Sequence, residues 1–140
     1  MPKFEMNKKK IAQSLNDVAD LVVHHIYNEM DSGKDINGKR FKRLKQSTID
    51  SKRKKGAKRP ESPLIDEDIM RAIYRDKTAT PNKLRSRVTV AKKREVIAEY
   101  HNEGEGNLPK REFFGIGKTV KPKMDKLVKL RLVKVLRTIK

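Results

Sequence analysis

Apolar residues near the N-terminus recur at steps of three and four. They are Ile11, Leu15, Val18, Val22 and Ile26. This spacing keeps apolar side chains on one face of a helix, and Ala19, Val23 and Met30 widen the stripe that they form. Gly33 follows the last apolar position of the stretch, Met30, and is a typical helix stop. The pattern predicts a long helix over residues 7–30.

The middle of the chain carries shorter apolar patterns, which predict two short helices. The first is expected to be capped by Ser47 and Thr48 and to include Ile49. The second is expected over residues 66–75. Ile65, Ile69 and Ile73 lie four apart, and three acidic residues stand at the expected helix N-terminus. Residues 76–85 are expected to form a loop.

Alternation of polar and apolar residues over 87–91 predicts a half-buried strand. Residues 95–102 are expected to be helical, with Val96, Ala98 and Tyr100 turned inward. Residues 111–116 are expected to be extended or turn-like, because glycines at 115 and 117 interrupt regular structure.

The C-terminal segment has two competing patterns. Pro122 suits the first turn of a helix, and apolar residues from Met124 to Ile139 form one helical face. Residues 130–135 also alternate, as a strand would. The length of the segment favours a helix.

These elements predict an α+β fold, in which a small antiparallel sheet packs with a long N-terminal helix, short middle helices and a C-terminal helix. At 140 residues the chain fits one domain, residues 1–140. Only 35% of the residues are hydrophobic and there is no Trp, so the core is expected to be thin and mostly aliphatic.

Charge dominates the composition. The chain has 36 Lys and Arg against 18 Asp and Glu, a formal net charge of +18. A compact monomer with this excess repels itself, and a polyanion or an acidic protein surface would relieve the repulsion. There is no Cys, which excludes disulfides and Cys-ligated metals. No apolar run suggests a signal peptide or a membrane span, so the cytoplasm is the expected place of synthesis and assembly.

The densest positive region lies between residues 39 and 59. Residues 50–62 are expected to form a flexible basic loop, since Gly56 interrupts the run and no periodicity is present. Phe41 is the single aromatic residue among these cations, which is too little for a base-stacking platform, so contacts with nucleic acid would be nonspecific contacts to phosphate. The residues expected to meet DNA or an acidic partner are Lys39, Arg40, Lys42, Arg43, Lys52, Arg53, Lys54, Lys55, Lys58 and Arg59.

Candidate chemistry in the chain is sparse. The turn at Asp35-Ile36-Asn37-Gly38 resembles the start of a calcium loop but lacks the later ligands and the distal Glu. His24 and His25 are adjacent on a helix, about 100° apart, and are expected on the surface or at its rim. His101 is expected to play a structural role, with a hydrogen bond to neighbouring backbone. We therefore expect no catalytic, cofactor or metal site.

Two stretches near the end of the chain carry a family resemblance. Residues 97–104 read Ile-Ala-Glu-Tyr-His-Asn-Glu-Gly, and residues 108–117 read Leu-Pro-Lys-Arg-Glu-Phe-Phe-Gly-Ile-Gly. They resemble the "Tyr-Ala-x-x-His-x-x-Gly" and "Pro-x-Arg-x-Phe-Leu-Gly" signature of the tailed-phage virion morphogenesis family, also called tail completion proteins. Stretches at 38–44, 47–52, 63–73 and 88–90 are similar to further family elements in the same order. Phe41 stands where the family has Trp.

The resemblance implies a structural virion protein with an α+β fold and no enzymatic activity. Such a protein acts in tail completion or head–tail (neck) assembly as a subunit of a ring, expected to be a hexamer or dodecamer. It is assembled in the host cytoplasm and resides in the virion. Its partners would be other copies of itself, other neck or tail proteins and packaged DNA, with no membrane.

An Arg and two aromatics between glycine-containing turns are typical of the energetic centre of an interface. One of Phe113 and Phe114 is expected to face the core and the other a neighbouring subunit. The full set of expected subunit contacts comprises Tyr100, His101, Arg111, Phe113, Phe114 and Gly115.

Two other functions fit parts of the sequence. One is a standalone basic protein that binds nucleic acid through nonspecific phosphate contacts. The other is a small nuclease that uses His101 with Glu99 or Glu103, although no metal-binding constellation accompanies these residues.

Overall fold

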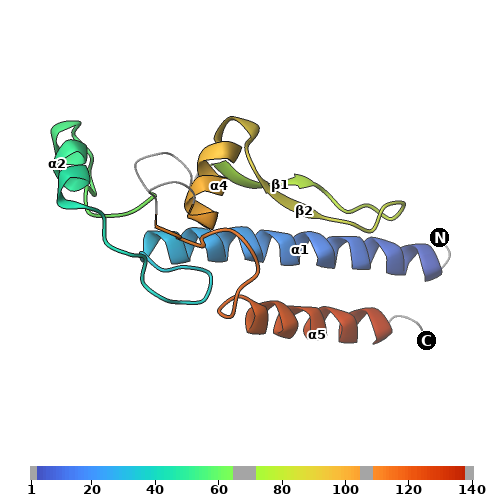
Figure 1. Ribbon diagram of the computed structural model, residues 1–140. Helices are drawn as coiled ribbons and strands as arrows, with labels where there is room; N and C mark the ends of the chain where they lie inside the picture. The colour runs from blue at the N-terminus through green and yellow to red at the C-terminus, as the bar shows by residue number, and fades with distance from the viewer. Residues whose placement is uncertain (1–2, 65–71, 105–108, 138–140) are drawn as a thin grey trace.

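The computed structural model describes residues 3–64, 72–104 and 109–137. Helix α1 (Lys3–Asp31) is the longest described helix, and the other elements lie along it or beyond its C-terminal end (Figure 1). Helix α5 (Lys121–Arg137) lies along one side of α1, while a β-hairpin and helix α4 (Glu95–Glu103) lie on the other side. Helix α2 (Gln46–Lys54) stands apart at one end. The expected α+β class is confirmed.

The apolar face of α1 supplies one wall of the core. Val22, Ile26 and Met30 are buried, and they pack in one cluster with Leu64, Ile73, Ala98, Phe113 and Val120. The predicted helix over 7–30 is confirmed and extends slightly at both ends. Gly33 follows the helix with a φ of +72°, a conformation that glycine adopts without strain. The core therefore lies toward the C-terminal half of α1.

The sheet is a two-stranded antiparallel hairpin of β1 (Ile73–Lys77) and β2 (Arg87–Val90). Ile73 pairs with Val90 and Tyr74 with Thr89. The strand expected over 87–91 is confirmed. The helix expected over 66–75 is wrong at residues 73–75, because cross-strand pairing of β-branched and aromatic residues outweighs the helical spacing of the isoleucines. Residues 66–71 lie outside the described residues.

The loop between the two strands is held to α1 by Asn16. Its side-chain amide donates to the carbonyl of Ala79 at 3.1 Å, and its Oδ1 accepts the Ala79 N–H at 2.7 Å. The Ser86 hydroxyl also donates to Asn16 Oδ1, at 2.6 Å. This polar contact fixes the hairpin along the helix axis, and no sequence pattern had singled out Asn16.

Helix α2 differs from its prediction at both ends. Lys45, not Ser47 or Thr48, occupies the position before the first turn, and no side chain caps the helix. The helix continues to Lys54, so the loop expected over 50–62 is helical in its first part. Ile49 is fully buried, and its burial with Lys52 explains why the helix continues into the basic run.

Helix α4 is confirmed and is preceded by a short 3-10 turn, η2 (Lys92–Arg94). It ends at Glu103, and Gly104 follows with a φ of +72° while its N–H donates to the Tyr100 carbonyl at 2.9 Å. Ala98 is buried as expected, but Val96 and Tyr100 are exposed, which corrects the inward positions expected for them. Among the α4 residues whose burial is described, Ala98 and His101 are buried and lie three residues apart, so the inward face is rotated from the one expected.

The C-terminal segment is a helix, with Pro122 in its first turn. Val120, just before α5, is buried, and Met124 in its first turn packs against the core. Beyond Met124 the helix leaves much of its apolar surface exposed, at Val128, Leu130, Leu132 and Val133. Within the part of the chain that the structure describes, no helix has the length and apolarity to cross a membrane.

Candidate functional site

Arg111 lies inside the protein rather than on a surface. Its side chain is only 3% exposed, and its Nε and Nη2 donate to the Lys42 carbonyl at 3.2 and 2.9 Å. Its backbone N–H donates to the His101 carbonyl at 2.8 Å. Burial lowers the pKa of the Arg111 guanidinium from its ordinary value. The expected subunit contact at Arg111 is therefore corrected, because the residue ties two segments of its own chain together.

The end of α4 holds the aromatic segment through Asn102. Its Oδ1 accepts the backbone N–H groups of Phe113 and Phe114, each at 3.1 Å. Two part-buried donors of a non-regular segment are thereby satisfied by one side chain. Sequence reasoning missed Asn102, because an Asn near a helix end usually caps or turns its own backbone rather than a segment ten residues away.

The residues expected at a subunit interface divide into two groups. Phe113 is 1% exposed and lies in the core, and His101 is also buried, so both are corrected as direct subunit contacts. Tyr100 is 45% exposed, and Phe114 and Gly115 are partly exposed. One Phe faces inward, as expected. A role in assembly stays a prediction for Tyr100, Phe114 and Gly115.

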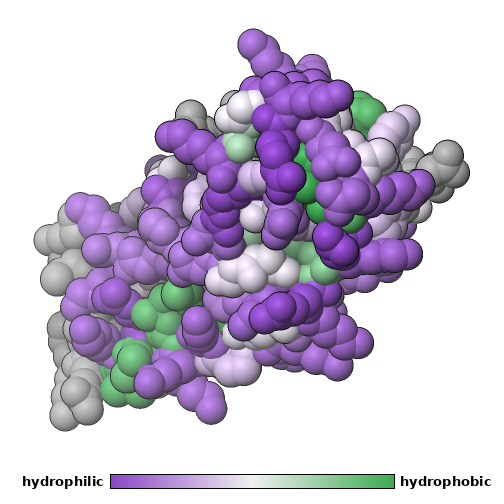
Figure 2. Space-filling model, turned by 90° about the vertical axis from the view of Figure 1, so that its left-hand side faces the viewer, coloured by the Kyte–Doolittle hydropathy of each residue, from purple (hydrophilic) through white to green (hydrophobic). Residues whose placement is uncertain are grey.

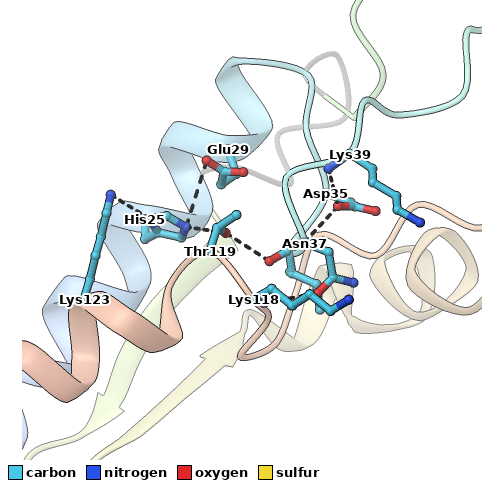
Figure 3. A network of polar contacts seen from close by, with 9 residues as sticks. His25, Glu29, Asp35, Asn37, Lys39, Lys118, Thr119 and Lys123 are labelled. Atoms are coloured by element: carbon cyan, nitrogen blue, oxygen red, sulfur yellow. Dashed lines mark hydrogen bonds and ion pairs between the residues drawn. The ribbon is translucent and has the colours of Figure 1, made fainter.

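The turn at residues 35–38 joins the same cluster. The Ile36 N–H donates to the Glu112 carbonyl at 2.8 Å, and Asn37 Oδ1 accepts the Lys118 N–H at 3.1 Å. Asp35 Oδ1 accepts two backbone N–H groups of its own turn, from Asn37 and Lys39 (Figure 3). The Asp-Ile-Asn-Gly turn is thus a structural clamp between the end of α1 and the start of α5.

His25 connects that clamp to both long helices (Figure 3). The Thr119 hydroxyl donates to the Ile36 carbonyl at 3.0 Å, so the contact at 2.8 Å between Thr119 Oγ1 and His25 Nε2 requires the imidazole N–H to donate. The other ring nitrogen, Nδ1, then accepts from Lys123 Nζ at 3.4 Å. His25 is buried, which corrects the surface position expected for it, whereas His24 is exposed.

The neutral form of His25 fits this network better than the charged form. Burial lowers its pKa from the ordinary value of about 6.5, and Lys123 lowers it further, while Glu29, 3.9 Å from Nε2, raises it. A lowered folded-state pKa means that the unfolded chain binds the proton first as the pH falls. The stabilising contribution of His25 is complete above pH 6.5 and is lost as the pH falls through its folded-state pKa.

We expect the loss of stability between pH 7.5 and pH 5 to be smaller in His25→Gln than in the native chain. Gln keeps a side-chain donor and acceptor but does not titrate, so the proton-linked part of the pH dependence disappears. Urea unfolding at the two pH values measures the difference. His24→Gln is the matched control, and an equal pH dependence in the native chain and in His25→Gln would contradict the assignment.

The basic region at the α2 end is exposed at all but one of its expected contact residues. Lys52 is the exception, since it is buried and its Nζ donates to the Ser62 carbonyl at 2.7 Å. Arg59 pairs with Asp31. Figure 2 views the molecule from this end, and the visible face is mostly hydrophilic. The exposed cations are Lys39, Arg40, Lys42, Arg43, Arg53, Lys54, Lys55, Lys58 and Arg59.

Arg111→Ala is expected to lower the free energy of unfolding by roughly 2 kcal/mol, because the buried guanidinium and its charged hydrogen bonds to the Lys42 carbonyl are lost. Arg40→Ala, at an exposed position, is the matched control and should change stability by less than about 0.5 kcal/mol. Chemical denaturation of both variants measures the effect. Equal, small changes in the two variants would show that the Lys42 contact contributes little.

Among the described residues, no three His, Cys, Asp or Glu side chains gather in a way that would hold a metal ion. The cluster at residues 35–38, 101–102 and 111–119 instead directs its polar groups at backbone atoms. Comparison with protein-family models, with curated proteins and with solved structures finds no match to the chain.

Proposed function

We propose that this protein is a structural subunit of a tailed-phage virion that acts in tail completion or neck assembly and forms a ring. The proposal rests on the segments that resemble the tail completion family. The segment near residues 38–44 is distant in sequence from the two near 97–104 and 108–117, and all three are joined through Arg111, the carbonyls of His101 and Lys42, and Asn102. The motif residues stabilise a scaffold, as expected for a building block.

The outward surfaces support an assembly role. The described part of α5 exposes four large aliphatic side chains, and α4 exposes Val96 and Tyr100. Apolar side chains that gather on the surface of a small, highly charged protein mark sites of interaction with other proteins. The basic α2 end would then meet packaged DNA or an acidic neighbouring ring.

Presence in purified particles tests this function. Quantitative mass spectrometry of particles is expected to find the protein in a fixed, low number of copies per virion. Deletion of its gene is expected to leave heads and tails that do not join or tails that do not finish, as seen by electron microscopy. Intact, infectious particles without the protein would overturn the proposal.

A standalone nucleic-acid-binding protein is the second candidate, and the exposed cations of the α2 end favour it. Such a protein would bind duplexes of any sequence, with an affinity that falls steeply with salt because counterions are released. Fluorescence anisotropy at several salt concentrations would detect this binding. Tight binding by a monomer, together with absence from particles, would favour the second candidate.

A further inference from the structure

A hollow with an apolar floor and an acidic rim, called the acidic hollow below, lies between the end of β2, helix α4 and the Phe113–Phe114 segment. Its volume is about 320 Å³, and Val90, Ala98 and the two Phe residues contribute its apolar lining. Its rim carries the carboxylates of Glu95, Glu99 and Glu103, which lie on one side of α4 at steps of four. All three are exposed. A concentrated acidic rim is unusual in a chain of net charge +18.

Helix α5 presents the complementary chemistry. Lys126, Lys129, Leu130 and Val133 fall at steps of three and four, so they share one face. All four are exposed, with Leu130 at 56% and Val133 at 46%. The half-buried positions of α5, Met124, Leu127 and Arg131, lie on the other side of the helix. This outward face therefore combines two aliphatic side chains with two ammonium groups.

The two surfaces cannot meet within one molecule. Helix α4 and the hairpin lie on one side of α1, and α5 lies on the other (Figure 1). Because α1 separates them, a contact between them joins two different copies of the chain. Surfaces on opposite sides of a rigid subunit give a head-to-tail arrangement, which grows into a ring or an open chain.

We propose that the outward face of α5 in one copy docks into the acidic hollow of the next copy. Leu130 and Val133 cover the apolar floor, while Lys126 and Lys129 reach the Glu95 and Glu99 side of the rim. The contact brings opposite charges together and relieves part of the repulsion between highly basic subunits. The inference rests on the proposed function, since it names the interface by which the ring would form.

Charge reversal tests the interface. One variant carries Glu95→Lys and Glu99→Lys, and the other carries Lys126→Glu and Lys129→Glu. Each alone places like charges across the contact, so self-association is expected to weaken at least about 100-fold. An equimolar mixture restores opposite charges at every contact and should regain assemblies of the native size. Sedimentation velocity at about 0.15 M salt, where screening acts over roughly 8 Å, measures both results.

Matched controls separate the interface from net charge. Asp50→Lys with Glu61→Lys, and Lys9→Glu with Lys83→Glu, change the charge equally at exposed positions outside the two surfaces. They should assemble like the native chain. All the substituted side chains are exposed, so circular dichroism and thermal unfolding should show folded variants.

The outcomes distinguish this interface from the proposed function. Native-sized assemblies formed by either reversed variant alone would overturn the interface while leaving a ring-forming role intact. A native chain that stays monomeric at about 50 μM would also overturn it. An equimolar mixture of the two charge-reversed variants that stays monomeric would overturn the interface as well. None of these results bears on whether the protein is found in virions, which the particle analysis decides.

Discussion

Phe113→Ala is expected to lower the free energy of unfolding by about 3–5 kcal/mol, the largest effect of any single truncation that we expect. Phe113 is 1% exposed and sits among core residues contributed by α1, β1 and α4. Removing the ring leaves a cavity where three elements meet, and collapse into it would disturb the Asn102 contact with the Phe113 N–H. Urea denaturation followed by circular dichroism measures the loss.

Phe114→Ala is the matched control for that experiment. Phe114 is only partly buried, and its backbone N–H shares the same Asn102 acceptor. The truncation should therefore cost clearly less than that of Phe113. Comparable losses of unfolding free energy in the two variants would contradict the prediction, because they would mean that the partly buried Phe114 contributes as much to the core as the fully buried Phe113.

Gly117→Ala is expected to destabilise the protein by roughly 3 kcal/mol, at the upper end of the range for overpacked interiors. A Cβ at this position would lie 2.6 Å from the carbonyl carbon of Ile36 and closer still to its oxygen. That oxygen accepts from both the N–H and the hydroxyl of Thr119. Backbone atoms cannot move aside as a flexible side chain can. The turn at residues 35–38 would therefore be pushed away from Thr119, and the contact between Thr119 and His25 would be disturbed.

Gly33→Ala is the matched control, because it places a side chain at positive φ without the steric clash expected at Gly117. Gly33 has a φ of +72°, but a Cβ there would meet nothing within 4 Å. The left-handed conformation alone should cost about 1 kcal/mol. Thermal unfolding of both variants provides the comparison. A Gly117 variant no less stable than the Gly33 variant would mean that the turn and the start of α5 are not in close contact.

Local patterns were sufficient for the elements whose own residues carry a clear helical or strand periodicity. The helix near residues 7–30, the helix near 95–102 and the strand near 87–91 follow from spacing alone. The region near Ile73 shows the limit of such patterns. Three isoleucines four apart predict a helix, but Ile73 belongs to a strand, because it pairs with Val90 across the hairpin and the local spacing does not reveal that contact.

The candidate site was predictable in location but not in role. The resemblance led to His101, Arg111 and Phe113, and these residues do lie together. The burial of Arg111 could not be predicted, since a guanidinium is usually exposed unless it is paired. The Lys42 carbonyl that receives Arg111 is 69 residues away in sequence. The acidic hollow was missed for the same reason, because β2, α4 and the aromatic segment form it only together.

The amino-acid sequence by itself determined the long helices, the basic character of the chain and the segments that resemble a virion protein family. These properties depend on composition and on spacing within a few turns, where the geometry of the backbone sets which residues share a face. Tertiary structure alone decided which motif residues are buried, which way α5 turns its aliphatic side chains and where acidic groups gather. Those outcomes depend on contacts between distant segments, and the free energy of such contacts is fixed only when the whole chain is packed.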